Sequence, residues 1–488
     1  MSEKRESLEK VYSKGDILAL AFGAMIGWGW VMLSGYWVEQ AGWLGAVIAF
    51  LIGGVMCIFV GLCYAELTPA LPCAGGGLVF AYRAMGYKLG WITIWCTCFA
   101  YVGVAAWEEI AISTAVNYII PIPQLGYLWT IAGYDVYASW SAIGMIVGLI
   151  LIIINLRGGK GAVLFQNVAT IGLTLVGLIF IIGGFSIGDP KFMGDAVKSG
   201  KGIFAVLLMV PAMYVGFDVI PQSAEEMNIP KKQIGKILIF SILLAGFWYV
   251  AMCIGIALAA PTNTRLNGAV PVADAAAFMF GNPIMGKVII LGALCGILTS
   301  WNGFIIGGAR VLFAMGRAKM LPPIFGKVNP KTQSPYAAII LIGIICELAP
   351  LLGKNALVWF VNASSFGVVV TYLFVCLAFV MLRKQEPNLE RPFKVKHDKF
   401  IGYGAITISV SFICLYLPFS SGGLVWPYEW GMILFWAVLG IILSLMTQKA
   451  YPNVTLKERE LLIFGELYAR KEIVGEILSN NKNTKLDV

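Results

Sequence analysis

The sequence predicts an all-α membrane protein with twelve transmembrane helices. Of its 488 residues, 59% are hydrophobic and only 12% are charged, whereas an ordinary soluble protein is about 25% charged. The chain holds twelve apolar stretches, each close to or above the length of about 20 residues that a helix needs to cross a bilayer. Two of these stretches are interrupted near their middles. Composition therefore excludes a soluble globular protein, and no polar stretch between the apolar ones is long enough to form a soluble domain.

The predicted spans follow one another closely along the chain. They cover residues 16–40, 43–67, 88–117, 137–156, 162–187, 203–222, 234–260, 285–316, 336–353, 355–382, 401–420 and 429–447. The ten cysteines lie almost all inside these spans and show no paired metal-ligand spacing. We interpret them as small buried residues, so neither a metal site nor a disulfide framework is expected.

Lysine and arginine are concentrated on one side of the predicted spans. If the N-terminus is cytoplasmic, 29 of the 35 basic residues lie on the cytoplasmic side, as the positive-inside rule requires. The outer side then holds Lys191, Lys198, Lys201, Arg265, Lys287 and Lys354. We expect a multi-pass protein of the plasma membrane (a bacterial inner membrane) with both termini in the cytoplasm. The asymmetry accounts for the net charge of +9, so the expected partners are membrane lipids and a small molecule, and no nucleic acid.

Span one contains the sequence GAMIGWGW, in which Gly23, Gly27 and Gly29 are poor helix formers. One interpretation is a glycine face for close helix packing. The other is an unwound turn between two half-helices, because bare backbone at mid-membrane depth is tolerated where it lines a cavity or binds a ligand. A second interrupted span favours the unwound turn.

Span six is the second interrupted helix. Pro211 removes a hydrogen bond to the preceding turn, Gly216 loosens the next turn, and Asp218 places a carboxylate inside the span. Spans one and six are five spans apart, and because five is odd, two five-span halves would have opposite orientations in the bilayer. This spacing predicts an inverted repeat with a binding site between the paired broken helices.

We therefore divide the chain into five segments. They are an N-terminal cytoplasmic tail (1–15), a first repeat with helices one to five (16–187), an inverted repeat with helices six to ten (188–382), a cytoplasmic loop with helices eleven and twelve (383–450), and a C-terminal cytoplasmic tail (451–488). The last segment has helical periodicity and mixed charge. We expect a solvated tail helix there, with a membrane-surface helix or a partner contact as alternatives.

Several motifs resemble those of the amino acid–polyamine–organocation (APC) superfamily of permeases. They are GAMIGWG (23–29), YAELTPALPCAGG (64–76), YVGFD (214–218), the segment 310–335 and RKQEPNLERPFKV (383–395). The motifs occur in the order that the superfamily shows, across about 400 residues. The resemblance implies a five-plus-five inverted-repeat (LeuT-like) fold with two additional helices, and secondary transport of an amino acid or amine.

The resemblance also implies a substrate site at the two breaks. Free N–H groups after Gly27 and Gly29 suit a carboxylate, and free carbonyls near Met25 and near 212–215 suit an ammonium. The substrate-binding residues expected in these breaks are Met25, Ile26, Gly27, Trp28, Gly29, Ala212, Tyr214, Val215 and Gly216.

Two positions depart from the pattern of the superfamily, which usually has a small or hydroxylated residue at Trp28 and often an aromatic gate at Ala212. We hypothesise an exchange in which the Trp28 indole fills the space of the span-six aromatic residue. The alternative is that Trp28 packs outward.

Two acidic residues, Glu108 and Glu109, lie next to each other inside span three. Adjacent helix positions point in directions about 100° apart, so these carboxylates should not share one role. Glu108 resembles a pocket-facing position of arginine- and agmatine-exchanging relatives, and we expect it to meet a cationic substrate group or to carry a proton. The alternative for Glu108 is a structural hydrogen bond to a backbone break, while Glu109 is expected to pair with a neighbouring helix.

Trp301 in span eight matches a position that stacks on substrate in those exchangers, although packing is an alternative. Thr299 and Ser300 are candidates for a sodium site, and Glu108 or Asp218 for proton coupling. The lysine that some proton-coupled relatives carry in span five is absent here, and the comparable position is Leu173. The coupling ion would therefore be H⁺ or Na⁺, and no other cofactor is expected.

The sequence thus predicts a secondary active transporter that moves an amino acid or small amine by alternating access, as a symporter or an antiporter. A carrier for neutral amino acids and a transporter-like membrane sensor are alternatives. An enzyme is not expected, because the GFSIG sequence at 184–188 lacks the strand–turn–helix context of a nucleophile elbow. The one histidine, His397, lies in a predicted cytoplasmic loop.

Overall fold

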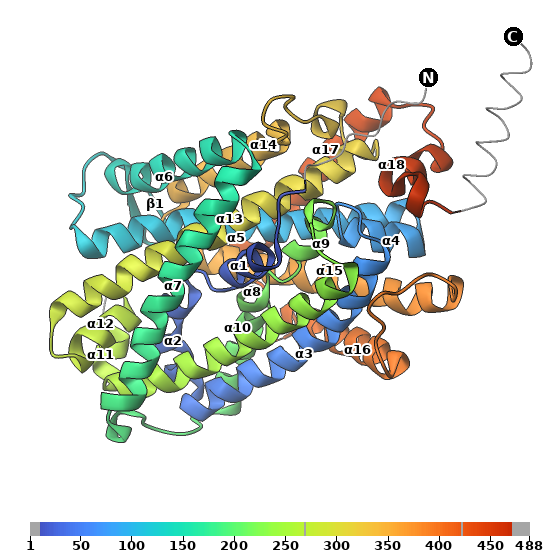
Figure 1. Ribbon diagram of the computed structural model, residues 1–488. Coiled ribbons are helices and arrows are strands. Elements are labelled where there is room, and N and C mark those ends of the chain that lie inside the picture. The colour runs from blue at the N-terminus through green and yellow to red at the C-terminus, as the bar shows by residue number, and fades with distance from the viewer. Residues whose placement is uncertain (1–9, 268–269, 421–422, 471–488) are drawn as a thin grey trace, which may run out of the picture.

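The computed structural model describes residues 10–267, 270–420 and 423–470, and this part of the chain is a bundle of helices (Figure 1). Ten described helices are long and apolar enough to cross a membrane. A bent pair, Lys14–Met25 with Gly29–Ala41, and a shorter apolar helix at Tyr336–Leu352 account for the remaining predicted spans. The predicted all-α membrane fold is therefore confirmed.

The helices keep the predicted order and, within a few residues, the predicted boundaries. Span one comprises α1 (Lys14–Met25) and α2 (Gly29–Ala41), and span six comprises α8 (Gly200–Tyr214) and α9 (Val219–Gln222). The other spans are α3 (Trp43–Ala70), α5 (Tyr87–Ile119), α6 (Ala138–Leu156), α7 (Gly159–Ile187), α10 (Lys231–Ala259), α13 (Pro283–Arg317), α14 (Tyr336–Leu348), α15 (Ala356–Gln385), α16 (Asp398–Tyr416) and α17 (Tyr428–Ala450). Outside the spans lie α4 (Gly77–Met85), α11 (Thr262–Asn267), α12 (Pro271–Met279), α18 (Leu456–Tyr468) and the strands β1 (Tyr127–Ile131) and β2 (Tyr134–Tyr137).

The two broken spans run antiparallel at the centre of the bundle (Figure 1). The first half of span one, α1, contacts the second half of span six, α9, while α2 contacts α8. The halves of span one meet at an angle of 46°. This head-to-tail arrangement is the geometry that an inverted repeat requires.

The break in span six falls at Gly216 and not at Pro211. Helix α8 continues through Pro211 to Tyr214, and the N–H of Val215 still donates to the Pro211 carbonyl at 3.1 Å. Gly216 has φ of 133°, a conformation that side chains rarely adopt. A Cβ atom on Gly216 would lie 2.8 Å from the Met25 nitrogen. The backbones of the two breaks therefore touch each other, and only glycine permits this approach.

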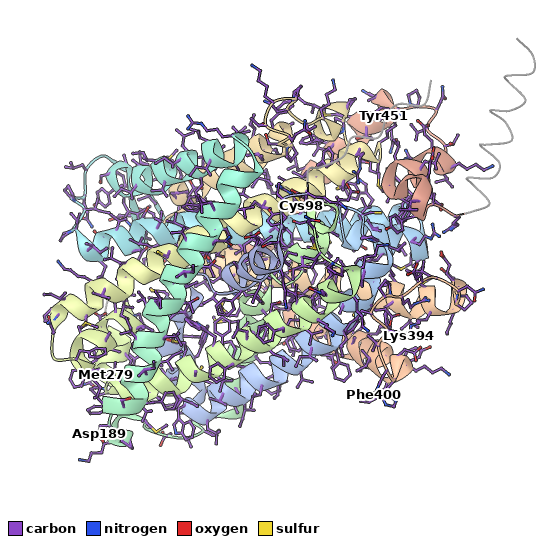
Figure 2. All side chains as sticks on the ribbon, in the orientation of Figure 1. Cys98, Asp189, Met279, Lys394, Phe400 and Tyr451 are labelled. Carbon is purple, nitrogen blue, oxygen red and sulfur yellow. The ribbon has the colours of Figure 1, made fainter. Side chains whose placement is uncertain are left out.

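The molecule has two distinct ends, which Figure 2 marks by Asp189 and Met279 on one side and by Lys394 and Tyr451 on the other. We call the first the hairpin end, because it carries the antiparallel β1–β2 hairpin. We call the second the terminal end, because it carries α18 and the first described residues of the chain. The hairpin was not predicted, since its short strands lie in a connection between two spans.

Buried ion pairs close the terminal end. The guanidinium of Arg310 on α13 donates to both oxygens of Glu226 at 2.7 and 2.8 Å, and both side chains are buried. Arg317 forms a second pair of bonds, both 2.8 Å, to Glu225. The N-terminal segment lies against the same turn, because the N–H groups of Val11 and Tyr12 donate to the Glu226 carbonyl. These contacts tie α13 to the connection after span six.

Helix α18 is anchored to the bundle, so the expectation of a solvated tail helix is wrong for residues 456–468. Glu460 is only 4% exposed and accepts a hydrogen bond of 2.9 Å from Arg83 on α4. Arg83 also binds both oxygens of Glu386, at 2.6 and 2.9 Å, and its guanidinium lies 5.1 Å from the centre of the Phe464 ring. The rest of the predicted tail, 471–488, lies outside the described residues.

Replacing Glu460 with alanine is expected to lower the free energy of unfolding by about 3 kcal/mol or more, since it leaves Arg83 with one buried carboxylate partner fewer. The measurement is thermal unfolding of the purified protein in detergent. Glu466→Ala is the matched control, because Glu466 lies on the same helix and is exposed. Equal unfolding temperatures for the two variants would show that the Arg83 cluster does not anchor α18.

Gly216→Ala is expected to destabilise the protein by about 1–3 kcal/mol, because it combines a strained backbone conformation with a steric clash. The variant Gly194→Ala separates the cost of the backbone conformation from the cost of the steric clash. The φ of Gly194 is 66°, and an added Cβ would meet no heavy atom within 4 Å. Gly194→Ala should therefore cost only about 1 kcal/mol. A Gly216→Ala protein as stable as the Gly194→Ala protein would contradict the close contact between the two breaks.

Candidate functional site

The two breaks, together with α5, α10 and α13, enclose a central cavity. Its walls include Gly27, Gly29, Glu108, Ala212, Tyr249 and Ser300. The cavity measures about 10 Å³, which is about the room that one water molecule needs. Span one, span three, span six and span eight thus converge as predicted, although the space between them is closed in this state.

Glu108 lies directly on the break of span one. Its Oε1 accepts a hydrogen bond of 3.4 Å from the backbone N–H of Trp28. A Cβ atom on Gly27 would lie 2.1 Å from the same oxygen and 2.8 Å from Ser300 Oγ. The glycine is therefore needed to admit the carboxylate, which occupies the start of α2, where free N–H groups favour negative charge. The other oxygen, Oε2, is buried and has no hydrogen-bond partner among the described residues.

The carbonyl groups of the span-one break do not face an empty site. The Met25 carbonyl, which was expected to be free, accepts a hydrogen bond of 2.7 Å from the hydroxyl of Tyr249 on α10. The carbonyls of Ile26 and Gly27 face α13, where a Cβ on Gly296 would lie 3.2 and 3.1 Å from them. An ammonium group at Met25 would therefore have to share this carbonyl with Tyr249 or displace its hydroxyl.

Several predicted substrate-binding side chains lie away from the central cavity. Tyr214 packs between α3 and α10, and its hydroxyl donates to the Phe50 carbonyl at 3.3 Å. Trp301 is buried but lines neither this cavity nor the larger one described below. Val215 and Gly216 contribute the backbone of the break and not a cavity wall. Of the span-six residues that we named, only Ala212 lines the central cavity.

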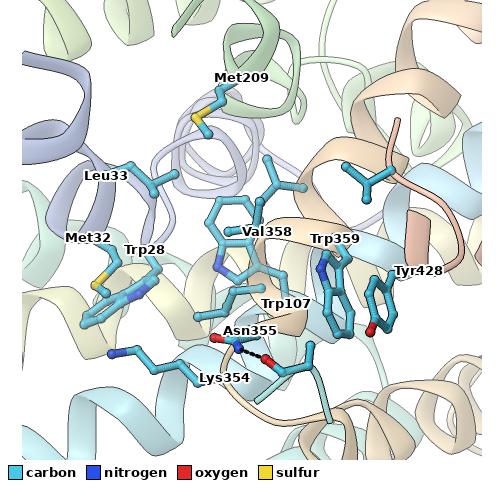
Figure 3. Close-up of a pocket in the computed structure, with 14 residues that line it drawn as sticks. Trp28, Met32, Leu33, Trp107, Met209, Lys354, Asn355, Val358, Trp359 and Tyr428 are labelled. Carbon is cyan, nitrogen blue, oxygen red and sulfur yellow. Dashed lines mark hydrogen bonds between the residues drawn. The ribbon is translucent and has the colours of Figure 1, made fainter. Parts of the chain in front are cut away.

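A larger cavity of about 450 Å³ opens toward the hairpin end (Figure 3). We call it the hairpin-end cavity. Its lining includes Trp28, Trp107, Met209, Lys354, Trp359 and Tyr428. Trp28 is fully buried, and it lines this cavity and not the central one. Trp107 borders both cavities. The Trp107 side chain thus separates the two cavities, while Trp28 follows Gly27 of the central cavity in the chain and lines the hairpin-end cavity.

Three of the four coupling candidates, Glu108, Asp218 and Thr299, form hydrogen bonds within the protein. Asp218 accepts hydrogen bonds from the Tyr101 hydroxyl at 2.7 Å and from the Gly216 N–H at 2.9 Å, so it stabilises the span-six break. The Thr299 hydroxyl lies 3.1 Å from the Gly23 carbonyl. Ser300 lies beside Glu108 through their shared contact with Gly27. Among the described residues, no cluster of three His, Cys, Asp or Glu side chains has the arrangement of a metal site.

Glu109 does not pair with a neighbouring helix in the expected way. Both of its carboxylate oxygens are buried without a hydrogen-bond partner in the described part of the chain. A Cβ on Gly148 would lie 2.9 Å from an oxygen of Glu109 and 2.9 Å from an oxygen of Glu347. The nearest polar group on α14 is therefore a second acid, and Glu109 faces away from the central cavity.

Four residues that line these cavities were not predicted as site residues: Trp107, Met213 and Tyr249 in the central cavity, and Lys354 in the hairpin-end cavity. Tyr249 lies on span seven, and no helix break or charged residue beside it in the sequence predicted a site there. Trp107 is adjacent to Glu108, and its position beside an intramembrane acid was the one available signal. Lys354 was identified as an outer basic residue but was not placed near a site.

Comparison with known proteins agrees with this architecture. A sequence profile described as amino acid permease matches residues 16–443. The methylthioribose transporter of Bacillus subtilis (strain 168) is 27% identical over 432 residues, which cover 87% of this chain and 91% of that protein. The branched-chain amino acid permease BcaP of the same organism is 25% identical over 471 residues, or 92% and 95% of the two chains. Its aspartate-proton symporter is 28% identical over 414 residues, or 82% and 78%.

The named cargoes of these relatives differ, but all of the names describe transport. The matching region begins at the first predicted span and ends within the last one. It therefore includes both breaks and every residue of the central cavity. This chain belongs to the amino acid permease family of multi-pass membrane transporters.

Proposed function

We propose that the protein carries its amino acid substrate across the plasma membrane by alternating access and that a proton is the coupling ion. The observation that carries this proposal is the hydrogen bond from the Trp28 N–H to Glu108. The start of a helix is a favourable place for a carboxylate. Glu108 occupies the place that the substrate carboxylate would take. The protein and its substrate would therefore compete for one anion site.

A proton would resolve this competition. Two carboxylates cannot both remain charged next to one helix start without strong repulsion. Protonation removes the charge of Glu108, and the Trp28 N–H then becomes available to the substrate. The released Glu108 would still be buried beside Ser300, as a hydrogen-bond donor. Substrate and proton would thus enter together, as in a symporter.

The closed terminal end supports one orientation of this cycle. With the termini in the cytoplasm, the Arg310–Glu226 and Arg317–Glu225 pairs close the cytoplasmic side. The hairpin-end cavity would then face outward, in the plasma membrane of a bacterium. Passage to the cytoplasm would require these buried pairs to separate, because they join α13 to the connection after span six.

Two alternatives use the same residues. Sodium could replace the proton if the hydroxyls of Thr299 and Ser300 turned toward it together with the Gly23 carbonyl. A cationic substrate could place its ammonium against the unpartnered Oε2 of Glu108. A sensor that binds an amino acid without moving it is a third alternative. Uptake into proteoliposomes under a pH gradient, a sodium gradient or no gradient separates these cases.

The expected result is accumulation of a labelled amino acid when the outside is acidic, with no requirement for sodium. Accumulation that depends on sodium alone would reject the proton. Saturable binding without any uptake would reject the carrier and favour the sensor.

Glu108→Gln is expected to abolish accumulation driven by a pH gradient and to retain exchange of substrate across the membrane, since glutamine carries no titratable proton. The measurement is uptake in the same proteoliposomes, with and without a gradient. Glu109→Gln is the matched control, because it makes the same change one residue along the helix and away from the central cavity. Retained gradient-driven uptake in the Glu108→Gln protein would show that Glu108 does not carry the coupled proton.

A further inference from the structure

The hairpin-end cavity is a compartment separate from the central cavity. Trp107 borders both cavities, and Trp28, which lies in the chain between Gly27 and Gly29 of the central cavity, lines the hairpin-end cavity. Its volume of about 450 Å³ falls within the range of about 300–1,000 Å³ that small-molecule sites occupy. The central cavity has room for one water, so of these two cavities only the hairpin-end cavity can hold a substrate in this state. The chemistry of its walls therefore determines which substrate the protein binds first.

The polar side chains of this cavity's lining include one amine, one amide, one phenol and three indoles, and none of them is a carboxylate. Lys354 is the one charged residue in its lining, and no carboxylate in the described part of the chain lies within ion-pair distance of its amine. Figure 3 shows that amine extending toward Trp28. The indole N–H groups of Trp28 and Trp107 are buried without a hydrogen-bond partner among the described residues. Buried donors without acceptors are costly, and a carboxylate would satisfy them.

Lys354 lies in the connection before α15, outside the spans. Burial in the cavity wall lowers the pKa of its amine, because desolvation disfavours the charged form. An anion beside the amine would offset that effect. An amine ligand without a carboxylate would instead be repelled.

The remaining walls are apolar and aromatic. The rings of Trp359 and Tyr428 are stacked, with centroids 4.1 Å apart and planes 2° apart. Met32, Met209 and Val358 complete a surface that suits an apolar side chain. The cavity thus combines one cation and two N–H donors with a large apolar wall, and this combination fits a carboxylate attached to an apolar body.

The unpredicted hairpin fixes the position of the lysine. The indole N–H of Trp129 on β1 donates to the Leu351 carbonyl at 2.8 Å, and the Asn355 amide donates to the Ala132 carbonyl at 3.2 Å. These two bonds flank Lys354 on both sides in sequence. Between them Gly353 has φ of 74° and packs against Tyr134 of β2. The backbone that carries the amine is therefore held against the hairpin.

We infer that the hairpin-end cavity is a second substrate site, which binds an amino acid with an apolar side chain through its carboxylate at Lys354 before Trp28 admits it to the central cavity. This inference rests on the proposed function. It goes beyond that function by selecting amino acids over amines and apolar side chains over charged ones. It also assigns a role to Lys354 that is distinct from the role of Glu108.

Transport kinetics in proteoliposomes test the inference with the variants K354Q and K354R. K354Q should raise the KM for an apolar amino acid such as leucine about tenfold, because one charge-assisted contact is lost. Its kcat should stay within about twofold of the native value, and K354R should restore the KM. K287Q is the matched control, because Lys287 is an exposed lysine on the same predicted outer side. An unchanged KM in K354Q, with native uptake intact, would overturn the inference and leave the proposed function standing.

A measurement on the native protein covers the case in which K354Q does not fold. Acetylation of Lys354 by acetic anhydride, followed by peptide mass spectrometry, should fall in the presence of leucine. It should not fall with isoamylamine, which is the same molecule without the carboxylate, and acetylation of Lys287 should not change with either ligand. Protection by both ligands, or by neither, would overturn the carboxylate site. Absence of any native uptake would reject the proposed function, while protection of Lys354 by leucine would still support the site.

Discussion

The contact between Gly216 and the backbone at Met25 holds the centre of the molecule together. A Cβ atom on Gly216 would lie 2.8 Å from the Met25 nitrogen, so the two broken helices touch at their breaks. The orientation of both half-helix pairs follows from this contact. Because the spans run antiparallel, the open start of α2 meets the broken middle of span six in one small volume. Buried backbone groups require partners in a membrane. Tyr249, Asp218 and Glu108 supply them.

These internal hydrogen bonds explain what a ligand would meet in the closed central cavity. The groups that would bind an amino acid are each engaged by the protein's own side chains, Glu108 on an N–H and Tyr249 on a carbonyl. Under the proposed function, a ligand would therefore replace existing hydrogen bonds and would not fill an empty pocket. Since the protein's own bonds must be displaced, the affinity for a ligand depends on the difference between the two sets of contacts. Such exchange couples binding to a change of state.

The two ends of the molecule are built differently. The terminal end is closed by buried arginine–glutamate pairs, and α18 braces α4 and the end of α15 beside them. The hairpin end has a cavity with aromatic walls and one lysine, whose loop is held by the β1–β2 hairpin. Paired charges close one side, whereas the other side presents Lys354, whose amine has no carboxylate within ion-pair distance among the described residues. This asymmetry matches a carrier in which substrate approaches from the hairpin end.

The sequence alone determined the class of fold, the twelve spans and the two breaks. Spans are predicted by local hydropathy, and breaks by glycine, proline or acidic residues inside a span, so both depend on neighbouring positions in the chain. The sequence also drew attention to Glu108, which lines the central cavity, since a carboxylate inside a span is costly. It named Pro211 and Gly216 together for the break in span six and could not decide between them, nor could it tell that Tyr214 packs against α3, because the tolerance of a helix for proline and the direction of a side chain depend on neighbouring helices. Only the tertiary structure decided that Glu108 binds the N–H of Trp28, that Tyr249 takes the Met25 carbonyl, and that Lys354 stands over a cavity. The residues involved lie at least 80 positions apart in the sequence or on separate helices. A local sequence pattern cannot predict contacts between residues so far apart.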